Sequence, residues 1–439
     1  MVLNQKKALV LAGGGSRGAY QIGVWQALRE IDYQFSIVTG TSVGALNGAM
    51  IAQGDFDKAK WLWENITLDQ VLDLELPESF QKLDEREQIS IFFKEIIKNG
   101  GAEFEALKQL LKKCLSEEKV RRSAIDLGIV TVKIPGYIPC TLFQAEIPKG
   151  QLIDYLLASS ACFPAMKSYS IEGKSYIDGG YYDNLPIELA QKRGATEIFA
   201  VDVDSFGLRR RYDKKKSMVH VLHPKEDLGF FLKFDAGLAK RNLQLGYFDT
   251  MKYFGKLDGI RYTFRKGSLE ENYRILLPAA VALSQQLGLT LEEWPKTSLE
   301  KVAHFSIMKT LRKYHKCSLQ FQDVFSCCLE FCADIFHLSS EKLYSIEEMN
   351  SRLCFLFKKR YQSFDHSLEK IFSAKQTGTI PVMLKEQLKE IDKKTLICLS
   401  YSLLLDAVKD PKKIHLLLLA LCCIPKECLC ALYISLMIR

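Results

Sequence analysis

Apolar residues recur with two different periods along the first 265 residues of the chain. Residues 7–12 form a short apolar run, a glycine-rich turn follows, and residues 19–31 carry apolar side chains at helical spacing. The same order then repeats, because an apolar run at residues 35–38 leads through a second small-residue turn into a helical segment at residues 45–51. Two successive strand, turn and helix units predict the start of a parallel α/β sheet.

This pattern continues with one interruption and then ends. Residues 55–120 are helical in spacing and highly charged, which indicates an insertion that covers the sheet or its mouth. Beyond residue 268 the β-branched runs become rare and long amphipathic stretches replace them. We therefore expect an α/β domain over residues 5–265 and an all-helical region over residues 270–439. Further strands are predicted at 124–133, 137–143, 174–177, 197–203 and 218–222.

The composition is that of a folded protein with a modest net charge. Of the 439 residues, 48% are hydrophobic and 26% are charged, and the formal net charge is +8. This charge does not indicate a nucleic-acid partner, which would need a clustered basic surface. One basic run lies between two apolar segments, and it is either a solvated loop or a loop that contacts lipid headgroups. Its members are Arg209, Arg210, Arg211, Lys214, Lys215 and Lys216.

The cysteines and the chain ends bear on the compartment. No secretory signal is recognised at the N-terminus, because the apolar run at residues 8–12 is too short. We therefore expect a cytoplasmic protein, in which the thiols are free and do not bind a metal. The 13 cysteines do not form two CxxC pairs, which favours core packing over zinc. Apolar runs at 414–424 and 428–438 are shorter than the roughly 20 residues that a spanning helix needs. They are predicted to be buried helices or, alternatively, an interfacial anchor at a membrane.

The first motif with chemical meaning lies between the second predicted strand and its helix. Gly40-Thr41-Ser42-Val43-Gly44 matches the nucleophile-elbow pattern G-x-S-x-G. A serine at such a turn sits in strained backbone geometry, and the glycines on either side remove Cβ atoms that would clash there. Ser42 is therefore the candidate nucleophile, although small-residue turns also occur without function.

The second motif follows the first strand and is rich in glycine. Gly13-Gly14-Gly15-Ser16-Arg17-Gly18 can turn consecutive backbone N–H groups toward one point, as an oxyanion hole requires. The spacing of Gly13, Gly15 and Gly18 also satisfies the dinucleotide pattern G-x-G-x-x-G. That pattern expects an acidic residue at the end of the second strand, where this sequence has Gly-Thr-Ser. The oxyanion role fits better.

The third motif is Asp178-Gly179-Gly180, which follows the predicted strand at 174–177. A carboxylate at a strand end with two glycines behind it can approach a serine closely and accept its proton. By itself, Asp-Gly-Gly is most often a turn. Its chemical interpretation depends on the other two motifs.

Taken in chain order, these three motifs resemble the patatin-like phospholipases over residues 7–265. The resemblance implies a three-layer α/β/α fold with a mostly parallel sheet, followed by the C-terminal helical region. It also implies a Ser-Asp dyad, in which Ser42 attacks the acyl carbonyl and Asp178 is the base, with an acyl-enzyme intermediate. Supporting positions are Ser159, Ser160, Pro164, Asn184 and Pro186.

The resemblance further implies which groups bind the oxyanion and which substrates are cleaved. The amides of Gly14, Gly15 and Arg17 would form the oxyanion hole, in a loop bounded by Gly13 and Gly18. Members of the family cleave acyl chains from phospholipids, lysophospholipids or neutral glycerides, and need no metal or other cofactor. The expected activity is that of a serine lipid acyl hydrolase of phospholipase A or lysophospholipase type, acting on membrane or micellar lipid with peripheral contact at most. No partner can be named for the helical region.

Two alternatives remain open at this point. A conventional Ser-His-Asp esterase would use His223, which follows a predicted strand, whereas His220 lies on the same face. A noncatalytic lipid- or anion-binding module would keep the fold without turnover. Lipid access is a separate question: an apolar stripe at helical spacing is either a core-facing helix or a lid helix. The stripe consists of Phe230, Phe231, Phe234 and Leu238.

Overall fold

The computed structural model divides the chain into two compact units, Met1–Phe254 and Gly255–Arg439. The sequence pattern placed this change slightly later, at about residues 265–270. The structure describes residues 6–73, 85–289, 295–315, 318–369, 371 and 380–438. Residues 74–84, within the predicted insertion, lie outside this description.

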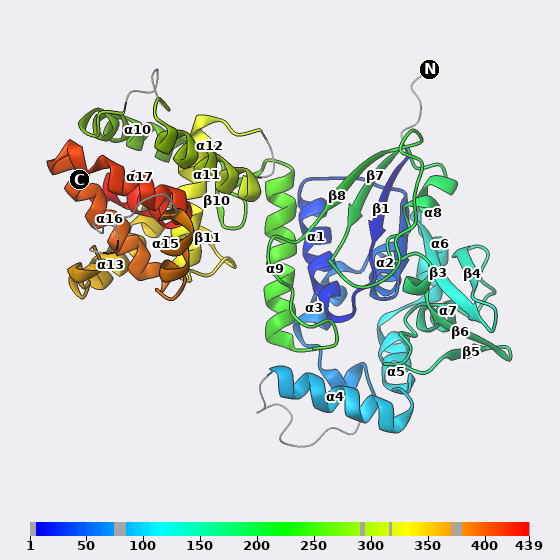
Figure 1. Cartoon of the computed structure of the whole chain (residues 1–439). Coiled ribbons are helices and arrows are strands. Elements are labelled where there is room, and N and C mark those ends of the chain that lie inside the picture. The colour runs from blue at the N-terminus through cyan, green and yellow to red at the C-terminus, as the bar shows by residue number, and fades with distance from the viewer. Residues whose placement is uncertain are drawn as a thin grey trace, which may run out of the picture. The chain divides into compact units, whose positions relative to one another are not determined.

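The first unit is built on an eight-stranded sheet in the order β5-β6-β3-β2-β1-β7-β8, with β4 paired to β3 (Figure 1). β3, β2, β1, β7 and β8 run parallel to one another, whereas β4 and β6 are antiparallel to β3. The sheet is thus mostly parallel, as predicted. The strands are β1 (Lys7–Leu11), β2 (Ile37–Thr41), β3 (Asp126–Ile134), β4 (Ile138–Phe143), β5 (Tyr169–Ile171), β6 (Lys174–Asp178), β7 (Glu197–Val201) and β8 (Met218–Leu222).

Helices cover both faces of this sheet, because successive side chains of a strand point to opposite faces. Val38 of β2 faces α2, where a Cβ added to Gly48 would lie 3.0 Å from its side chain. The next residue, Thr39, donates a hydrogen bond of 2.9 Å to the carbonyl of Pro186, where α8 begins. The central strands β1 and β7 are buried almost throughout, as expected of a sheet enclosed on both faces. The first unit is therefore a three-layer α/β/α structure.

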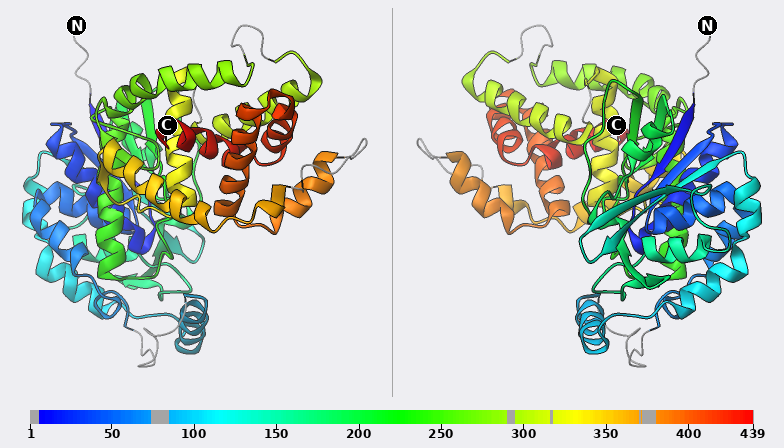
Figure 2. Two further views of the ribbon diagram at one scale, coloured as in Figure 1. Left: turned by 90° about the vertical axis from the view of Figure 1, so that its left-hand side faces the viewer. Right: turned by 90° about the vertical axis from the view of Figure 1, so that its right-hand side faces the viewer.

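The helices of the first unit include those of the predicted insertion. Figures 1 and 2 show α4 beyond the edge at which the parallel strands end, and α1 beside α9. The bounds are η1 (Gly15–Arg17), α1 (Gly18–Glu30), α2 (Val43–Gln53), α3 (Phe56–Glu64), η2 (Leu68–Gln70), α4 (Glu85–Asn99), α5 (Glu105–Cys114), α6 (Glu117–Arg122), α7 (Leu152–Ser159), η4 (Gly179–Tyr181), α8 (Ile187–Lys192) and α9 (Ala236–Tyr253).

The second unit is helical, with a three-stranded sheet in the order β11-β10-β9 that the sequence pattern did not predict. These strands are only two or three residues long, too short to show a period along the chain. The elements are β9 (Leu257–Asp258), β10 (Thr263–Arg265), α10 (Ser268–Gln286), α11 (Ser298–His315), α12 (Phe321–Ile335), β11 (Leu343–Tyr344), α13 (Ile346–Gln362), η5 (His366–Glu369), α15 (Ile380–Lys389), α16 (Lys393–Lys409), η6 (Pro411–Lys413), α17 (Ile414–Cys423) and α18 (Pro425–Ile438).

The two apolar runs at the end of the chain are α17 and α18, and both contribute to the core of the second unit. Leu417, Leu421 and Ile434 are at most 5% exposed. The core-helix alternative therefore describes these segments. In the part of the chain that the structure describes, none of the helices has the length and apolarity to cross a bilayer. The twelve described cysteines are free thiols, as expected.

Candidate active site

The proposed nucleophile lies at a strained turn between β2 and α2. Ser42 has φ 55° and ψ −129°, a backbone conformation that residues with a Cβ rarely adopt. Its amide donates a hydrogen bond of 2.9 Å to the hydroxyl oxygen of Ser159, which in turn donates one of 2.7 Å to the carbonyl of Val130. This chain of hydrogen bonds fixes the turn to the adjacent strand β3.

The two glycines of the elbow are required by close backbone approach. A Cβ on Gly44 would lie 2.3 Å from the carbonyl oxygen of Leu11, and one on Gly40 would lie 2.3 Å from Gly44. No side chain fits at either distance. The turn therefore depends on glycine at both positions, for the reason that the sequence motif suggested.

The register of the sheet brings Asp178 to Ser42. β2 and β6 pair with the same side of β3, one parallel and one antiparallel, so that their carboxyl ends face each other. Thr41 is opposite Val130, and Asp178 is opposite the next residue, Thr131. Residues 42 and 178, which are far apart in the sequence, are thus placed together, and the Ser42 side chain lies close enough to lower the pKa of Asp178.

The environment of Asp178 changes its acidity. The carboxylate is 5% exposed and accepts a hydrogen bond of 2.7 Å from the amide of Gly180. Burial raises the pKa of Asp178 to about 6, while the hydrogen bonds from Gly180 and Ser42 oppose this shift. A carboxyl group with this pKa is ionised at neutral pH and is a stronger base than an ordinary aspartate.

The glycine-rich loop leaves two amides available. The amides of Gly13, Arg17 and Gly18 donate to main-chain oxygens of Asn184, Gly14 and the η1 turn. Within the described chain, those of Gly14 and Gly15 donate no hydrogen bond, and both residues line the cavity that also contains Ser42. Of the five loop residues predicted for the oxyanion hole, only these two present unpaired N–H groups.

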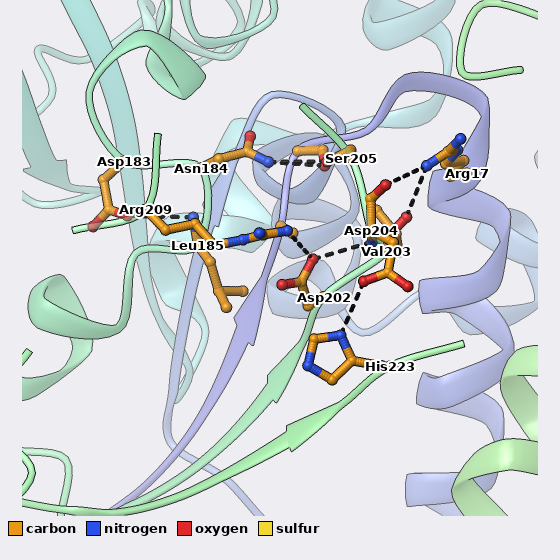
Figure 3. Close-up of polar contacts among 12 residues, drawn as sticks. Arg17, Asp183, Asn184, Leu185, Asp202, Val203, Asp204, Ser205, Arg209 and His223 are labelled. Atoms are coloured by element: carbon orange, nitrogen blue, oxygen red, sulfur yellow. Dashed lines mark hydrogen bonds and ion pairs between the residues drawn. The ribbon is translucent and has the colours of Figure 1, made fainter. Parts of the chain in front are cut away.

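Arg17 has a different contact from the one expected at the oxyanion. Its guanidinium donates to the carbonyls of Gly229 at 2.9 Å, Val203 at 3.2 Å and Asp204 at 2.5 Å. Figure 3 shows the last two contacts. The side chain therefore joins the glycine-rich loop to the segments after β7 and before α9, and its positive charge is directed at these carbonyls.

Three polar residues that the sequence did not single out as functional support the glycine-rich loop or the nucleophile turn. Asn184 donates to Ser205 at 2.9 Å (Figure 3), and the Ser205 hydroxyl donates to the carbonyl of Gly13. Ser159 holds the nucleophile turn, as described above. The sequence offered a signal only for Asn184 and Ser159, as positions that support the family resemblance, because their contacts arise from segments distant in the chain.

The site opens into an apolar cavity of about 500 Å³. One face of α2 lines it, through side chains three and four residues apart, starting beside Ser42. Cys114 lines the end of the cavity farthest from Ser42. Its carbonyl accepts a hydrogen bond from the side chain of Gln53, the last residue of α2. The lining residues of α2 run from Val43 to Met50, a rise of about 10 Å, so the cavity extends along α2. Its apolar lining includes Val43, Leu46, Met50, Ala59, Leu62, Trp63, Leu107, Leu111 and Cys114.

The histidine of the alternative triad has other partners. His223 contacts Asp204 at 3.0 Å, and His220 contacts the hydroxyl of Tyr253 at 2.6 Å. His223 lies with Asp204 and Asp202 at the ends of β7 and β8 (Figure 3), with ligand-type atoms within 4.8 Å of one another. Arg209 already pairs with Asp202 there, at 2.8 Å. Neither histidine is among the residues that line the cavity with Ser42.

The interpretation of the phenylalanine stripe as a helix was wrong. α9 begins only at Ala236, after the N-cap residue Asp235, so Phe230, Phe231 and Phe234 lie in the preceding loop. The loop is held by Ser16, whose amide and hydroxyl donate to the carbonyls of Phe231 and Phe230. These contacts compete with helical hydrogen bonding. They also bring Phe231 and Phe234 into the lining of the cavity.

The fold and site together define an α/β protein with a strained serine turn, a buried carboxylate and a glycine-rich loop around one apolar cavity, as in serine hydrolases. Residues 9–190 match the family model "Patatin-like phospholipase". This match confirms, over residues 9–190, the resemblance that the three motifs indicated.

Individual relatives agree with this assignment. The chain is 30% identical over 217 residues to patatin-like phospholipase domain-containing protein 7 of Mus musculus, covering 47% of this chain and 14% of that protein. It is 29% identical over 209 residues to lysophospholipase nte1 of Aspergillus terreus, covering 45% and 12%. These relatives are thus several times longer than the chain. Among solved structures, VipD from Legionella pneumophila aligns over 96% of this chain and 91% of its own, with 12% identity and a TM-score of 0.36.

Proposed function

We propose that the chain is a serine acyl hydrolase of phospholipase A or lysophospholipase type, with Ser42 as nucleophile and Asp178 as base. One observation carries this proposal: the ends of β2 and β6, which lie next to each other along β3, bring Ser42 and Asp178 together in the lining of one apolar cavity. The family match and the name of the lysophospholipase relative support it.

The reaction follows from these positions. As the Ser42 hydroxyl oxygen attacks the ester carbonyl carbon, its proton passes to the carboxylate of Asp178. The tetrahedral oxyanion is stabilised by the amides of Gly14 and Gly15. Its collapse breaks the C–O bond, and the departing alkoxide takes the proton from Asp178. Water then attacks the acyl-enzyme with Asp178 again as base, which releases the fatty acid and restores Ser42.

The cavity determines which part of a lipid is bound. Its lining along α2 is almost entirely apolar, which suits a fatty acyl chain rather than a headgroup. With the ester at Ser42, the acyl chain would extend toward Cys114 and the alcohol portion would remain toward the opening. The substrate is accordingly a lipid with at least one long acyl chain, drawn from a membrane or a micelle.

The proposal is tested with the full-length chain and two substitutions. We expect Ser42→Ala and Asp178→Asn each to reduce release of fatty acid from phospholipid or lysophospholipid by about 10⁴-fold or more. Ser42→Ala should also abolish labelling by a fluorophosphonate. His223→Ala is the matched control, and it should retain turnover.

Two outcomes would contradict the proposal. Turnover that survives Asp178→Asn but not His223→Ala would favour the triad esterase. A folded wild-type chain that neither labels nor releases fatty acid from any lipid of the panel would favour the noncatalytic binding module.

A further inference from the structure

Exposed apolar side chains gather where the cavity opens. Single exposed apolar residues are normal on protein surfaces, but several at one opening are not. Phe206 is 89% exposed, Leu208 63% and Tyr181 40%, and all three also line the cavity. Phe163, 53% exposed, joins them, since its carbonyl accepts a hydrogen bond from the Tyr181 hydroxyl. We call these four residues the apolar rim.

The backbone of the apolar rim is tied to the active site. Leu208 donates to the carbonyl of Gly180 at 2.9 Å and accepts from the amide of Asn184 at 2.6 Å. The Phe206 ring packs edge-on against Phe231, with centroids 6.5 Å apart. Water therefore surrounds large apolar side chains whose main chain is fixed within two residues of Asp178. Such an arrangement keeps these side chains exposed instead of letting them fold inward.

The basic run of the same connecting segment lies elsewhere. Residues 202–217 link the end of β7 to the start of β8. Because these two strands are parallel, the segment runs from the edge where the strands end to the edge where they begin. Phe206 and Leu208 are at the active-site edge, whereas Lys214, Lys215 and Lys216 precede Met218 at the opposite edge. Arg209 forms an ion pair with Asp202, and Arg210 forms one with Glu188. The apolar rim is thus separated from the lysines.

These observations lead us to propose that the apolar rim is the surface by which the chain binds a lipid bilayer, with Phe206 and Leu208 inserted among the acyl chains. The inference rests on the proposed lipid substrate. A bilayer is the occupant that the geometry favours, because the rim is continuous with the cavity that leads to Ser42. A protein seated on the rim would close the opening, while a bilayer both covers the rim and supplies the substrate.

The position of the lysines adds a specific expectation about lipid charge. Because Lys214, Lys215 and Lys216 lie at the other edge of the sheet, binding should come from apolar contact and not from attraction to anionic headgroups. Vesicles of phosphatidylcholine should therefore suffice, and raising the salt concentration should not release the protein.

The experiment measures binding without catalysis. The full-length chain carrying Ser42→Ala is sedimented with phosphatidylcholine vesicles, alone and with Phe206→Ser and Leu208→Ser added. We expect the double substitution to weaken partitioning by about tenfold or more, since two large side chains lose their insertion. Phe206→Trp, which keeps an aromatic ring, should retain binding. The control, Met218→Ser, removes an apolar side chain of 59% exposure at the opposite edge and should not change binding.

Three results would overturn the inference. The folded double variant could partition to vesicles as the parent does. Binding could be lost when Lys214, Lys215 and Lys216 are replaced by Glu. The parent could fail to bind any vesicle while an acidic protein binds the apolar rim. Hydrolysis of a soluble short-chain ester by the chain with Ser42 intact tests the proposed function separately. Vesicle binding without that hydrolysis would support the apolar rim and contradict the enzyme assignment. Hydrolysis without vesicle binding would support the enzyme assignment and contradict the apolar rim.

Discussion

The acidity of one buried carboxyl group links the local structure to the pH dependence of the reaction. Burial raises the pKa of Asp178 to about 6, and only the ionised form can accept the proton of Ser42. Activity should therefore be full above about pH 7 and fall about tenfold for each unit below 6. The measurement is kcat/KM for a soluble ester from pH 4.5 to 8, with circular dichroism at each pH as the control for folding. A profile that stays flat through pH 6 would contradict the role of Asp178.

The same shift has an opposite effect on stability. A folded-state pKa above the usual aspartate value means that the folded chain binds a proton more readily than the unfolded chain between about pH 6 and 4. Protonation of Asp178 thus favours the folded state over this range, while it removes the base. Loss of activity below pH 6 is consequently expected before any unfolding that this residue could cause.

Ser159 is the second residue whose role can be tested alone. Its hydroxyl accepts from the amide of Ser42 and donates to Val130, and it is fully buried. Ser159→Ala should reduce kcat by about tenfold or more, because the strained turn loses its fixed position, and should cost about 1–3 kcal/mol of unfolding free energy. Ser160→Ala, whose hydroxyl donates within its own helix to Leu156, should have the smaller effect on both kcat and urea unfolding. Equal effects of the two substitutions would remove the special role of Ser159.

At the level of secondary structure elements, α2 and α5 set the length of the cavity. Cys114, the last residue of α5, is 4% exposed and stands at the end of α2 farthest from Ser42. Cys114→Trp should reduce hydrolysis of a long-chain substrate by about tenfold or more and spare a short-chain ester, since the added ring occupies the far end only. The readout is the ratio of kcat/KM values for acyl chains of increasing length. Cys114→Ala is the control, and loss on all chain lengths alike would indicate general overpacking instead.

The sequence allowed the strand and helix order of the first unit to be predicted, together with the two turns at Gly13 and Gly40, because these signals are local. Periodicity identifies an element and glycine identifies a tight turn. The family resemblance added the fold. What no local pattern contains is the register that places β6 beside the end of β2, and hence the contact between Ser42 and Asp178.

The error at the phenylalanine stripe has an equally physical cause. The loop at Phe230 and Phe231 has helical spacing, yet the glycine-rich loop binds its carbonyls and Gly15, at φ 55°, approaches Phe231 so closely that a Cβ would lie 2.1 Å from its carbonyl oxygen. The basic run, by contrast, is exposed, as a solvated loop would be, and the connection between β7 and β8 separates Arg209 from the lysines. At the phenylalanine stripe, tertiary contacts decided against the local pattern.

For the molecule as a whole, the division into two units predicts that they respond separately to damage in their cores. Glu330 of α12 is fully buried in the second unit and accepts hydrogen bonds from the amides of Ile260 and Arg261 at 2.7 and 2.8 Å, and from the Tyr314 hydroxyl at 2.6 Å. Glu330→Ala would remove the acceptor of these three hydrogen bonds and leave a cavity in the core, at a cost of about 3–5 kcal/mol.

Calorimetry of the full-length chain can detect this separation. A loss of that size should lower the melting temperature of a unit of this length by about 10 °C, so the transition of the second unit should move to lower temperature. The transition of the first unit, and the labelling of Ser42 below it, should remain where they are, because Glu330 has its contacts within Gly255–Arg439. Glu347→Ala, at an exposed position of α13, is the matched control. A single transition that shifts as one, with labelling lost at the same temperature, would show that the two units fold as one cooperative body and that the second contributes directly to the stability of the active site.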